Sequence, residues 1–275
     1  MNELFYLLSI FLITTQNTSA ASTVSCDAMV APSGSQPLRF DASERLRADR
    51  MISVFENGTL EFQYDYCDNI HDGCGFTVGR IGFCTSQGDF LEVVEAFTAL
   101  VPENPLLPFL PRLKELAATK SESIVGLEAL PAAVALAAKN PIFRHVQDKK
   151  VDELEFEPAS AFADKTKLKL KLSLADIYQA GVQLGWGDDP TSVPVLSKQA
   201  SNLVVGKYGR WIEACWLESF MTLHRNALRD SPIAAARESV GRGEAMLKIF
   251  QEGNLDFHGP IDMAPYGPEE TFHIP

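Results

Sequence analysis

Residues 41–58 have the sequence DASERLRADRMISVFENG. Its apolar side chains recur every three or four residues, which predicts one amphipathic helix with a stripe of Ala48, Met51, Ile52 and Phe55. Asp41 or Ser43 can cap the start of this helix, and Gly58 is the usual kind of residue beyond a helix end. Glu56 therefore lies in the last turn, next to the apolar stripe and close to the core.

The sequence after this helix predicts a small sheet with a glycine-rich turn. Residues 58–66 alternate apolar and polar side chains, the period of a half-buried strand. The turn around Asp72, HDGCG, follows, and residues 76–81 predict a second short strand. Glu56, at the end of the helix, and Asp72, in the turn after the predicted strand, then lie at opposite ends of one structural unit. In such a unit, two carboxylates can face each other across a cleft. Cleavage of a glycosidic bond needs such a pair, with one acid for the leaving oxygen and one base to activate water.

Most of the chain after Asp89 has the spacing of amphipathic helices. After a first helix that ends before Pro102, further helices are predicted at 105–118, 123–139, 158–184, 209–229 and 232–252. Lys and Leu alternate over 167–172, a period that favours a strand and competes with the helix there. The 275 residues are enough for one large domain or two lobes. We expect a mainly α (α+β) protein with one small antiparallel sheet and a cleft beside it.

The first forty residues differ in composition from the rest. The apolar run at residues 4–14 is too short to span a bilayer, and small residues follow it near Ala20. We therefore expect residues 1–20 to be a secretory signal peptide, although the run is preceded by Glu3 and by no Lys or Arg. A membrane-anchored or internal start is the alternative. Residues 21–40 predict a flexible segment, which leaves 41–275 as the folded domain of an extracellular protein.

The chain is acidic, with a formal net charge of −12. Removal of residues 1–20 takes away only Glu3, which gives −12 + 1 = −11. This charge argues against a nucleic-acid partner and suits a cationic substrate, although many secreted proteins are acidic only for solubility. After the first twenty residues, no segment of the sequence is long and apolar enough to predict a membrane span.

The five cysteines are an odd number, so at least one is free or pairs with another chain in an oxidising compartment. Cys67 and Cys74 flank Asp72, and a disulfide between them would close its loop. The sequence has no Cys-x-x-Cys pair and its five histidines are scattered, so we expect neither a metal nor a cofactor.

Several motifs together resemble the family 46 chitosanases, glycoside hydrolases of the lysozyme-like superfamily. The first region has FENGT at 55–59, QYDY at 63–66, DGCGFTVGRIGFC at 72–84 and GD at 88–89. Others follow in order: PEN at 102–104, LP at 110–111, FEPA at 156–159, DPTS at 189–192 and GNLD at 253–256. The likeness covers roughly residues 43–257. One four-residue match is weak, but several in the same order are a strong signal.

The resemblance implies a two-lobed, lysozyme-like fold that hydrolyses β-1,4 bonds in chitosan by an endo, inverting mechanism. Glu56 matches the general acid of the family, Asp72 the general base, and Thr77 a residue that helps to hold the attacking water. Tyr66 matches a tyrosine of the substrate cleft, and Asp89 a carboxylate that binds a glucosamine ammonium group. We expect a monomer that acts on chitosan, with no nucleic-acid or membrane partner.

Each of these residues also has a structural alternative. Glu56 can end an amphipathic helix on its solvent side, and Asp72 can serve the turn chemistry of an Asp-Gly pair. Asp89 can cap a helix, Tyr66 can pack in the sheet, and Thr77 can be present for its strand propensity.

Two departures from the family pattern bear on activity. Cys74 replaces the usual Arg of the turn after Asp72, and a thiol offers neither the charge nor the hydrogen bonds of a guanidinium. Some members have an Asp and two Arg around the general acid; Gln179 and Phe220 match two of these positions, and Arg242 is the candidate for the third. The alternative function is therefore a catalytically weakened or inactive chitosan-binding protein of the same fold.

Overall fold

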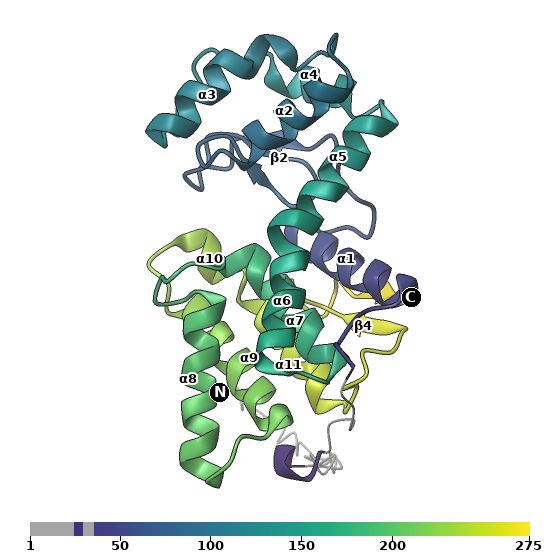
Figure 1. The fold of residues 1–275 in the computed structure, drawn as a ribbon, viewed down its shortest axis with the longest axis vertical. Coiled ribbons are helices and arrows are strands. Elements are labelled where there is room, and N and C mark those ends of the chain that lie inside the picture. Colours follow the sequence, from purple (N-terminus) through teal and green to yellow (C-terminus); the bar gives the residue numbers. More distant parts are fainter. Residues whose placement is uncertain (1–24, 30–35) are drawn as a thin grey trace, which may run out of the picture.

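The computed structural model describes residues 25–29 and 36–275, which form two lobes (Figure 1). The predicted signal peptide, residues 1–20, lies outside the described residues, as does part of the predicted flexible segment 21–40. The smaller lobe contains a sheet and the helices α2 (Asp89–Leu100), α3 (Leu110–Thr119) and α4 (Leu130–Ala137). The larger lobe contains α6 (Glu157–Thr166), α7 (Lys171–Leu184), α8 (Val193–Tyr208), α9 (Glu213–Arg229), α10 (Ala234–Glu238) and α11 (Val240–Gln251).

Helix α1 (Ala42–Asn57) lies where the two lobes meet and confirms the first predicted helix. The Asp41 side chain accepts a hydrogen bond from the N–H of Glu44, and the Glu44 carboxylate accepts one from the N–H of Asp41. Gly58 ends the helix with φ 62°, a left-handed conformation that glycine adopts without strain. The predicted apolar stripe is buried, so the last turn with Glu56 is held against the core.

The sheet of the smaller lobe is antiparallel, as predicted, but its strands are short. Its order is β1 (Cys67–Asp68), β2 (Thr77–Val78), β3 (Phe83–Cys84). The strand predicted over 58–66 is wrong, because contacts with α5 (Pro141–Val151) hold this segment instead. The Tyr64 hydroxyl donates to Asp148 at 2.9 Å, and the Gln147 amide donates to the Tyr64 carbonyl at 2.9 Å. These bonds replace the ladder that the alternating pattern predicted.

One helical rod connects the lobes (Figure 1). It runs through α5, the π-helical turn η3 (Asp152–Phe156) and α6. Pro158 at the start of α6 explains the wide turn, because proline has no N–H and its ring clashes with the carbonyl four residues back. The sequence prediction lacks α5 and α8.

The single helix predicted over 158–184 is two helices, α6 and α7, so that prediction is wrong in its middle. Lys167 adopts the left-handed conformation, with φ 59°, and ends α6. The buried carboxylate of Glu213, from α9, accepts hydrogen bonds from the N–H groups of Lys169 and Leu170 at 2.9 Å. It therefore satisfies backbone donors at the start of α7 that have no partner inside the helix.

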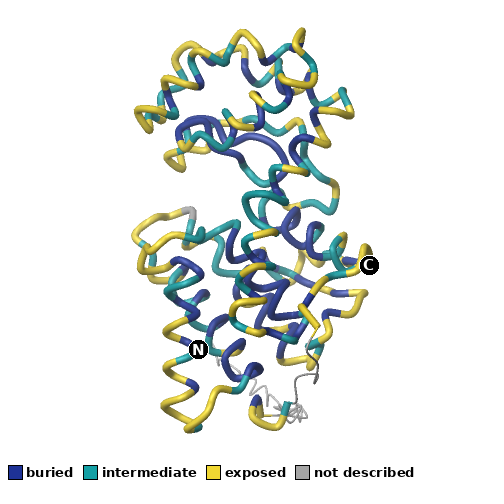
Figure 2. Tube along the Cα trace, in the orientation of Figure 1, coloured by how far each residue is buried: buried dark blue, intermediate teal, exposed yellow. Residues whose placement is uncertain are grey.

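Helix α7 is the centre of the larger lobe, because every residue from Leu172 to Gly181 is buried (Figure 2). Helices α6, α8 and α9 pack against it, and α9 also packs against α11. A disulfide joins Cys26, in the short turn η1 (Cys26–Ala28), to Cys215 of α9. The strands β4 (Ile261–Met263) and β5 (Phe272–Ile274) form a second antiparallel pair that the sequence prediction lacks, and β5 contacts α1.

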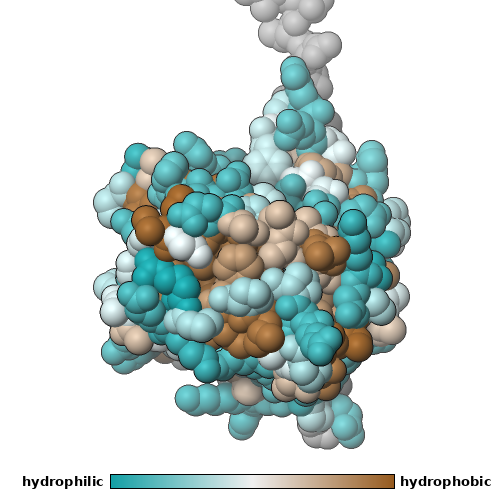
Figure 3. All heavy atoms as spheres, turned by 90° about the horizontal axis from the view of Figure 1, so that it is seen from above, coloured by the Kyte–Doolittle hydropathy of each residue, from teal (hydrophilic) through white to brown (hydrophobic). Residues whose placement is uncertain are grey.

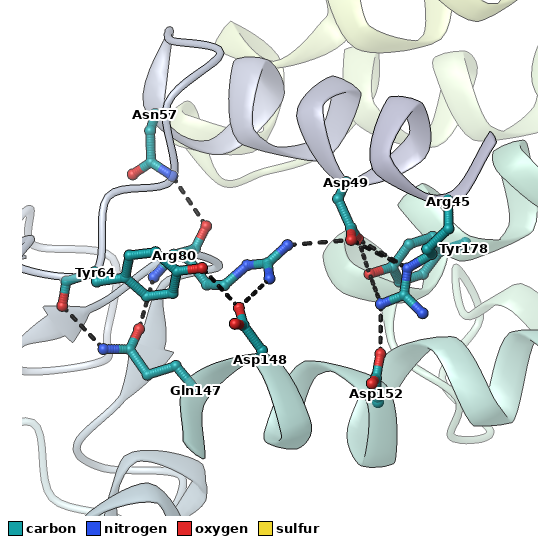
Figure 4. A network of polar contacts seen from close by, with 9 residues as sticks. All are labelled: Arg45, Asp49, Asn57, Tyr64, Arg80, Gln147, Asp148, Asp152 and Tyr178. Atoms are coloured by element: carbon teal, nitrogen blue, oxygen red, sulfur yellow. Dashed lines mark hydrogen bonds and ion pairs between the residues drawn. The ribbon is translucent and has the colours of Figure 1, made fainter. Parts of the chain in front are cut away.

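A network of ion pairs joins the two lobes (Figure 4). Arg80, from the loop after β2, pairs with Asp49 of α1 at 3.4 Å and with Asp148 of α5. Asp49 also accepts a hydrogen bond from the Tyr178 hydroxyl of α7 at 2.8 Å and pairs with Arg45. Arg80 and Asp49 are buried, so each of the two charges depends on its partners for compensation.

The outer face of the smaller lobe carries apolar side chains among hydrophilic ones (Figure 3). The exposed large apolar residues of this lobe include Leu100, Leu107, Val125 and Leu136. Over the ranges 25–29 and 36–275, no helix has the length and apolar character needed to cross a bilayer.

The interlobe network predicts a large effect of one arginine on stability. Arg80→Met leaves the buried Asp49 carboxylate short of a partner, so the free energy of unfolding should fall by about 3 kcal/mol. Urea unfolding followed by circular dichroism measures this change. The matched control is Arg39→Met, whose pair with Asp164 is exposed and should contribute less than about 1 kcal/mol. Equal losses in the two variants would contradict a stabilising role for the network.

Candidate active site

Both lobes contribute to one cavity of about 420 Å³. Of the residues predicted for the site, Glu56, Tyr66, Asp72, Thr77 and Arg242 line this cavity, whereas Asp89 does not. Residues from the end of α1, from the sheet and its loops, and from α7 and α11 therefore meet at one place. The structure brings together the two carboxylates that the sequence predicted as a pair.

Glu56 reaches the cavity from the last turn of α1. Its side chain is 23% exposed, and its Oε1 accepts a hydrogen bond from Nη2 of Arg242 at 2.6 Å. Arg242 lies on α11, is buried, and also donates to the carbonyl of Phe55 at 3.2 Å. A charge-assisted bond of this length holds the Glu56 carboxyl group in one orientation. The sequence predicted burial beside an apolar stripe and named Arg242 as the candidate charged neighbour, and in the structure the Arg242 guanidinium contacts Glu56.

The carboxyl-terminal segment supports the same end of α1. The Tyr266 hydroxyl lies 2.5 Å from the Val54 carbonyl and 2.8 Å from the Phe55 carbonyl. Gly241 of α11 lets this segment approach, because a Cβ there would lie 1.7 Å from the carbonyl oxygen of Pro265. Tyr266 was not among the residues predicted for the site, and it lies beyond the range that resembles the family.

The Asp72 carboxylate is held by one donor of its own turn and by one donor from β2. The Thr77 hydroxyl donates to Oδ2 at 2.9 Å, and the N–H of Cys74 donates to Oδ1 at 3.0 Å. Asp72 is exposed, so its oxygens can accept a further hydrogen bond from water. Thr77 touches the carboxylate that it was predicted to assist, and its part in holding water stays a prediction.

Cys74 forms a disulfide with Cys84 of β3, so the predicted pairing of Cys67 with Cys74 is wrong. The turn that contains Cys74 packs on the end of β3, where the Thr85 hydroxyl donates to the Cys74 carbonyl at 2.8 Å, and Cys67 is a free thiol. A bridge over so short a loop removes chain entropy from the unfolded state worth about 3 kcal/mol. The residue that replaces the usual Arg of the family therefore fixes the Asp72 turn covalently.

Tyr66 and Asp89 have different surroundings. Tyr66 lines the cavity, and burial, then the charges of Asp68 and Asp72, raise the pKa of its hydroxyl. Asp89 begins α2, and its Oδ1 accepts hydrogen bonds from the N–H groups of Cys84 and Phe90 at 2.9 Å. Burial raises the pKa of Asp89 to about 6. Oδ1 of Asp89 thus binds the backbone. Oδ2 has no hydrogen-bond partner among the described residues and is left for a ligand.

Glu155, on η3, is a carboxyl group that the sequence analysis did not single out. Its Oε2 accepts a hydrogen bond from the indole N–H of Trp186 at 3.0 Å. Burial raises the pKa of Glu155 to about 7; the Trp186 bond lowers it, while the charges of Asp89 and Glu56 raise it further. Glu155 directly precedes the FEPA motif, but a glutamate on a helix is usually exposed, so its partial burial could not be predicted from the sequence pattern.

The two positions matched to charged residues of the family hold neutral side chains that are buried. The Gln179 amide donates to Asp176 at 2.8 Å and lies 3.5 Å from Nδ1 of His224. Phe220 stacks on Trp216 with ring centroids 5.4 Å apart. Within the described ranges, Glu56 is therefore the one carboxylate in ion-pair contact with Arg242.

The site combines two carboxylates, each with fixed hydrogen-bond partners, in a cavity between a helical lobe and a lobe with a small sheet. This arrangement is that of a glycoside hydrolase, which protonates a leaving oxygen with one carboxyl group and activates water with the other. Across residues 25–29 and 36–275, no group of three or more His, Cys, Asp or Glu side chains is arranged to hold a metal ion.

The chain belongs to glycosyl hydrolase family 46, whose model matches residues 50–261. It is 38% identical over 223 residues to a chitosanase of Bacillus subtilis (strain 168), which covers 79% of this chain and 80% of the relative. A chitosanase of Streptomyces sp. (strain N174) is 32% identical over 258 residues, 93% of this chain and 90% of the relative.

Solved structures agree with this assignment. A family 46 chitosanase of Gynuella sunshinyii in complex with chitotetraose superposes with a TM-score of 0.79 at 39% identity, covering 86% of this chain and 99% of the other. The native chitosanase of Bacillus subtilis MY002 gives a TM-score of 0.80 at 36% identity, covering 86% and 100%. The mainly helical, lysozyme-like fold with a small antiparallel sheet, predicted from the sequence, is confirmed.

The raised pKa of Glu155 predicts how stability depends on pH. The folded protein keeps this proton up to about pH 7, whereas the unfolded chain loses it near the ordinary value of 4.5. The folded state therefore binds more protons in this interval, and the group lowers stability as the pH rises through it. Glu155→Gln removes this loss, so the melting temperature of the variant minus that of the wild type should increase from about pH 5 to about pH 8.

The control for this experiment is Glu269→Gln, which changes an exposed glutamate in the same way. Thermal unfolding at both pH values gives the two differences in melting temperature. For the control, the melting temperature of the variant minus that of the wild type should not change with pH. The same constant difference for Glu155→Gln would show that the pKa of Glu155 is not raised.

Proposed function

We propose that this protein is a secreted, endo-acting chitosanase that hydrolyses β-1,4 bonds of chitosan with inversion at the anomeric carbon. The observation that carries the proposal is the shared cavity, which Glu56 enters from α1 and Asp72 from the loop before β2. Relatives that cover most of the chain are chitosanases, and one related structure holds chitotetraose. Two disulfides, Cys26–Cys215 and Cys74–Cys84, support an oxidising, extracellular location.

In this mechanism Glu56 is the general acid. The protonated carboxyl group gives its proton to the glycosidic oxygen while the bond between that oxygen and the anomeric carbon breaks. Because Arg242 binds Oε1, the transferable proton is assigned to Oε2. After the transfer, the guanidinium of Arg242 stabilises the carboxylate that remains.

Asp72 is the general base. Its carboxylate takes one proton from a water molecule, and the resulting hydroxyl attacks the anomeric carbon on the face opposite to the leaving oxygen, which inverts the configuration. The Thr77 hydroxyl already donates its hydrogen to Asp72, so its oxygen is left to accept a hydrogen bond from the same water. One proton is lost by Glu56 and one is gained by Asp72, and solvent exchange restores both groups.

The charge of the protein supports a cationic polymer as substrate. The mature chain would carry −11, which attracts a polycation over long distance. Tyr66, in the cavity wall, offers a surface for a sugar ring. Asp89 lies outside the cavity lining, at the start of α2, and keeps Oδ2 available for an ammonium group. Carboxylates placed near the amino groups of the sugar select the deacetylated polymer over chitin by charge.

A second candidate function is chitosan binding without hydrolysis. The observation that favours it is that Gln179 and Phe220, which are buried and neutral, occupy the positions matched to charged residues of the family. Such a protein would bind chitosan and release no product at any pH at which it is folded.

Substitution of the two carboxylates tests the proposed roles. Glu56→Gln and Asp72→Asn remove the acid and the base without a change of size, so each should lower kcat on chitosan by roughly 100-fold or more. The readout is the size and amount of glucosamine oligomers released. Glu61→Gln, an exposed glutamate of the same region, is the matched control and should keep the wild-type rate. Wild-type protein that binds chitosan and releases no oligomer would favour the second candidate.

A further inference from the structure

Gln183, on α7, lines the same cavity as Glu56 and Asp72, and the mechanism above gives it no part. Its amide has partners on both sides. Oε1 lies 3.1 Å from Nε2 of His224, and Nε2 donates to the hydroxyl of Ser239 at 2.6 Å. Ser239, which also lines the cavity, donates in turn to the carbonyl of Ala236 at 2.8 Å. The orientation of the Gln183 amide is therefore fixed at the cavity wall.

The same chain of hydrogen bonds continues into the core behind Gln183. Because the amide oxygen of Gln183 can only accept, the proton of His224 is assigned to Nε2, and Nδ1 is left as an acceptor. The Gln179 amide nitrogen faces that acceptor at 3.5 Å and gives its other hydrogen to Asp176 at 2.8 Å. Every bond then runs in a consistent direction, from Gln179 through His224 to Gln183.

His224 stays neutral in this arrangement. Burial, with the charge of Arg242 as a second cause, lowers the pKa of His224 to about 3. Its ring is fully buried and packs near Phe220, with centroids 6.5 Å apart. Because the ring is neutral above about pH 3, its one N–H keeps the Gln183 amide in the same orientation over that range.

The groups that Gln183 leaves free define the chemistry of its ligand. One amide hydrogen and one lone pair of Oε1 have no partner in the part of the chain that the structure describes, so the side chain presents a donor beside an acceptor. A hydroxyl group, which donates and accepts, matches both. An ammonium group can only donate, so it matches the acceptor alone.

We propose that Gln183 is a substrate-binding residue that hydrogen-bonds a neutral hydroxyl group of the sugar chain, and that His224 is a positioning residue that orients its amide. This inference rests on the proposed function of the cavity. It assigns recognition of neutral sugar groups to the α7 wall, in contrast to the carboxylates that meet the amino groups.

The test uses steady-state kinetics on a glucosamine hexamer. Gln183→Met keeps the length of the side chain and removes its hydrogen bonds, so KM should rise roughly threefold to tenfold, with kcat changed less than about twofold. Gln183→Glu replaces the free donor by a carboxylate and should raise KM as well. The matched control, Gln251→Met on the exposed end of α11, should keep both constants.

The His224 variants test the positioning role. His224→Phe keeps a ring and removes the donor to Gln183, so KM should rise as in Gln183→Met. His224→Gln retains an N–H near the position of Nε2 and should restore most of the affinity. Thermal unfolding checks each variant, and the Gln183 variants carry the test if a His224 variant does not fold.

Two results would overturn the inference: a KM for Gln183→Met within twofold of the wild type, or tighter binding of the hexamer by Gln183→Glu, which would show that the residue faces an ammonium group. Failure of the proposed function looks different, because the wild type itself would then release no product. In that case calorimetric binding of the same hexamer tests the inference. The affinity of Gln183→Met, Gln183→Glu and His224→Phe should be lower than that of the wild type, and His224→Gln should restore most of it.

Discussion

The contact between Arg80 and the buried carboxylate of Asp49 is the interaction on which the site depends. Arg80 comes from the loop after β2 in the smaller lobe, while Asp49 lies on α1, two helical turns before Glu56. The Arg80 carbonyl also accepts a hydrogen bond from the Asn57 side chain at 3.0 Å, directly next to Glu56. One residue of the sheet region thus binds α1 at two points and fixes the position of the acid relative to the lobe of the base.

The remaining supports hold each carboxylate within its own lobe. Arg242 and the carboxyl-terminal Tyr266 hold the end of α1 at Glu56. The Cys74–Cys84 disulfide and the Thr77 hydroxyl hold Asp72. The acid and the base therefore share no direct support, so a change in one loop alters one role and leaves the other in place.

Features with a local cause could be predicted from the sequence. The start and end of α1 follow from Asp41 and Gly58, whose capping roles need no tertiary contact. The pair Glu56 and Asp72 was identified by its place at the two ends of one unit and by motifs in family order. The presence of both in one cavity agrees with that hypothesis.

Features with a distant cause could not be predicted. The segment 58–66 alternates apolar and polar residues like a strand. In the structure, however, the side chain of Gln147 in α5, more than eighty positions later, donates a hydrogen bond to the backbone carbonyl of Tyr64. The break after Lys167 depends on the Glu213 carboxylate, which lies 213 − 167 = 46 positions later. Sequence spacing suggested Cys67 as the partner of Cys74, whereas the packing of the turn on β3 selects Cys84. The partial burial of Glu155 likewise depends on the contact between η3 and Trp186, which follows α7, and the bond between Gln183 and His224 depends on the packing of α7 against α9.

The central claim is that Glu56 and Asp72 act as acid and base on opposite sides of the anomeric carbon, with a water molecule between Asp72 and the sugar. The most direct measurement is proton NMR of the anomeric signals during the first minutes of hydrolysis of a glucosamine hexamer, before mutarotation mixes the anomers. The account predicts that the α-anomer appears first, since the cleaved bond is β and one displacement inverts it. First appearance of the β-anomer would contradict it, because retention requires a carboxylate that attacks the sugar itself.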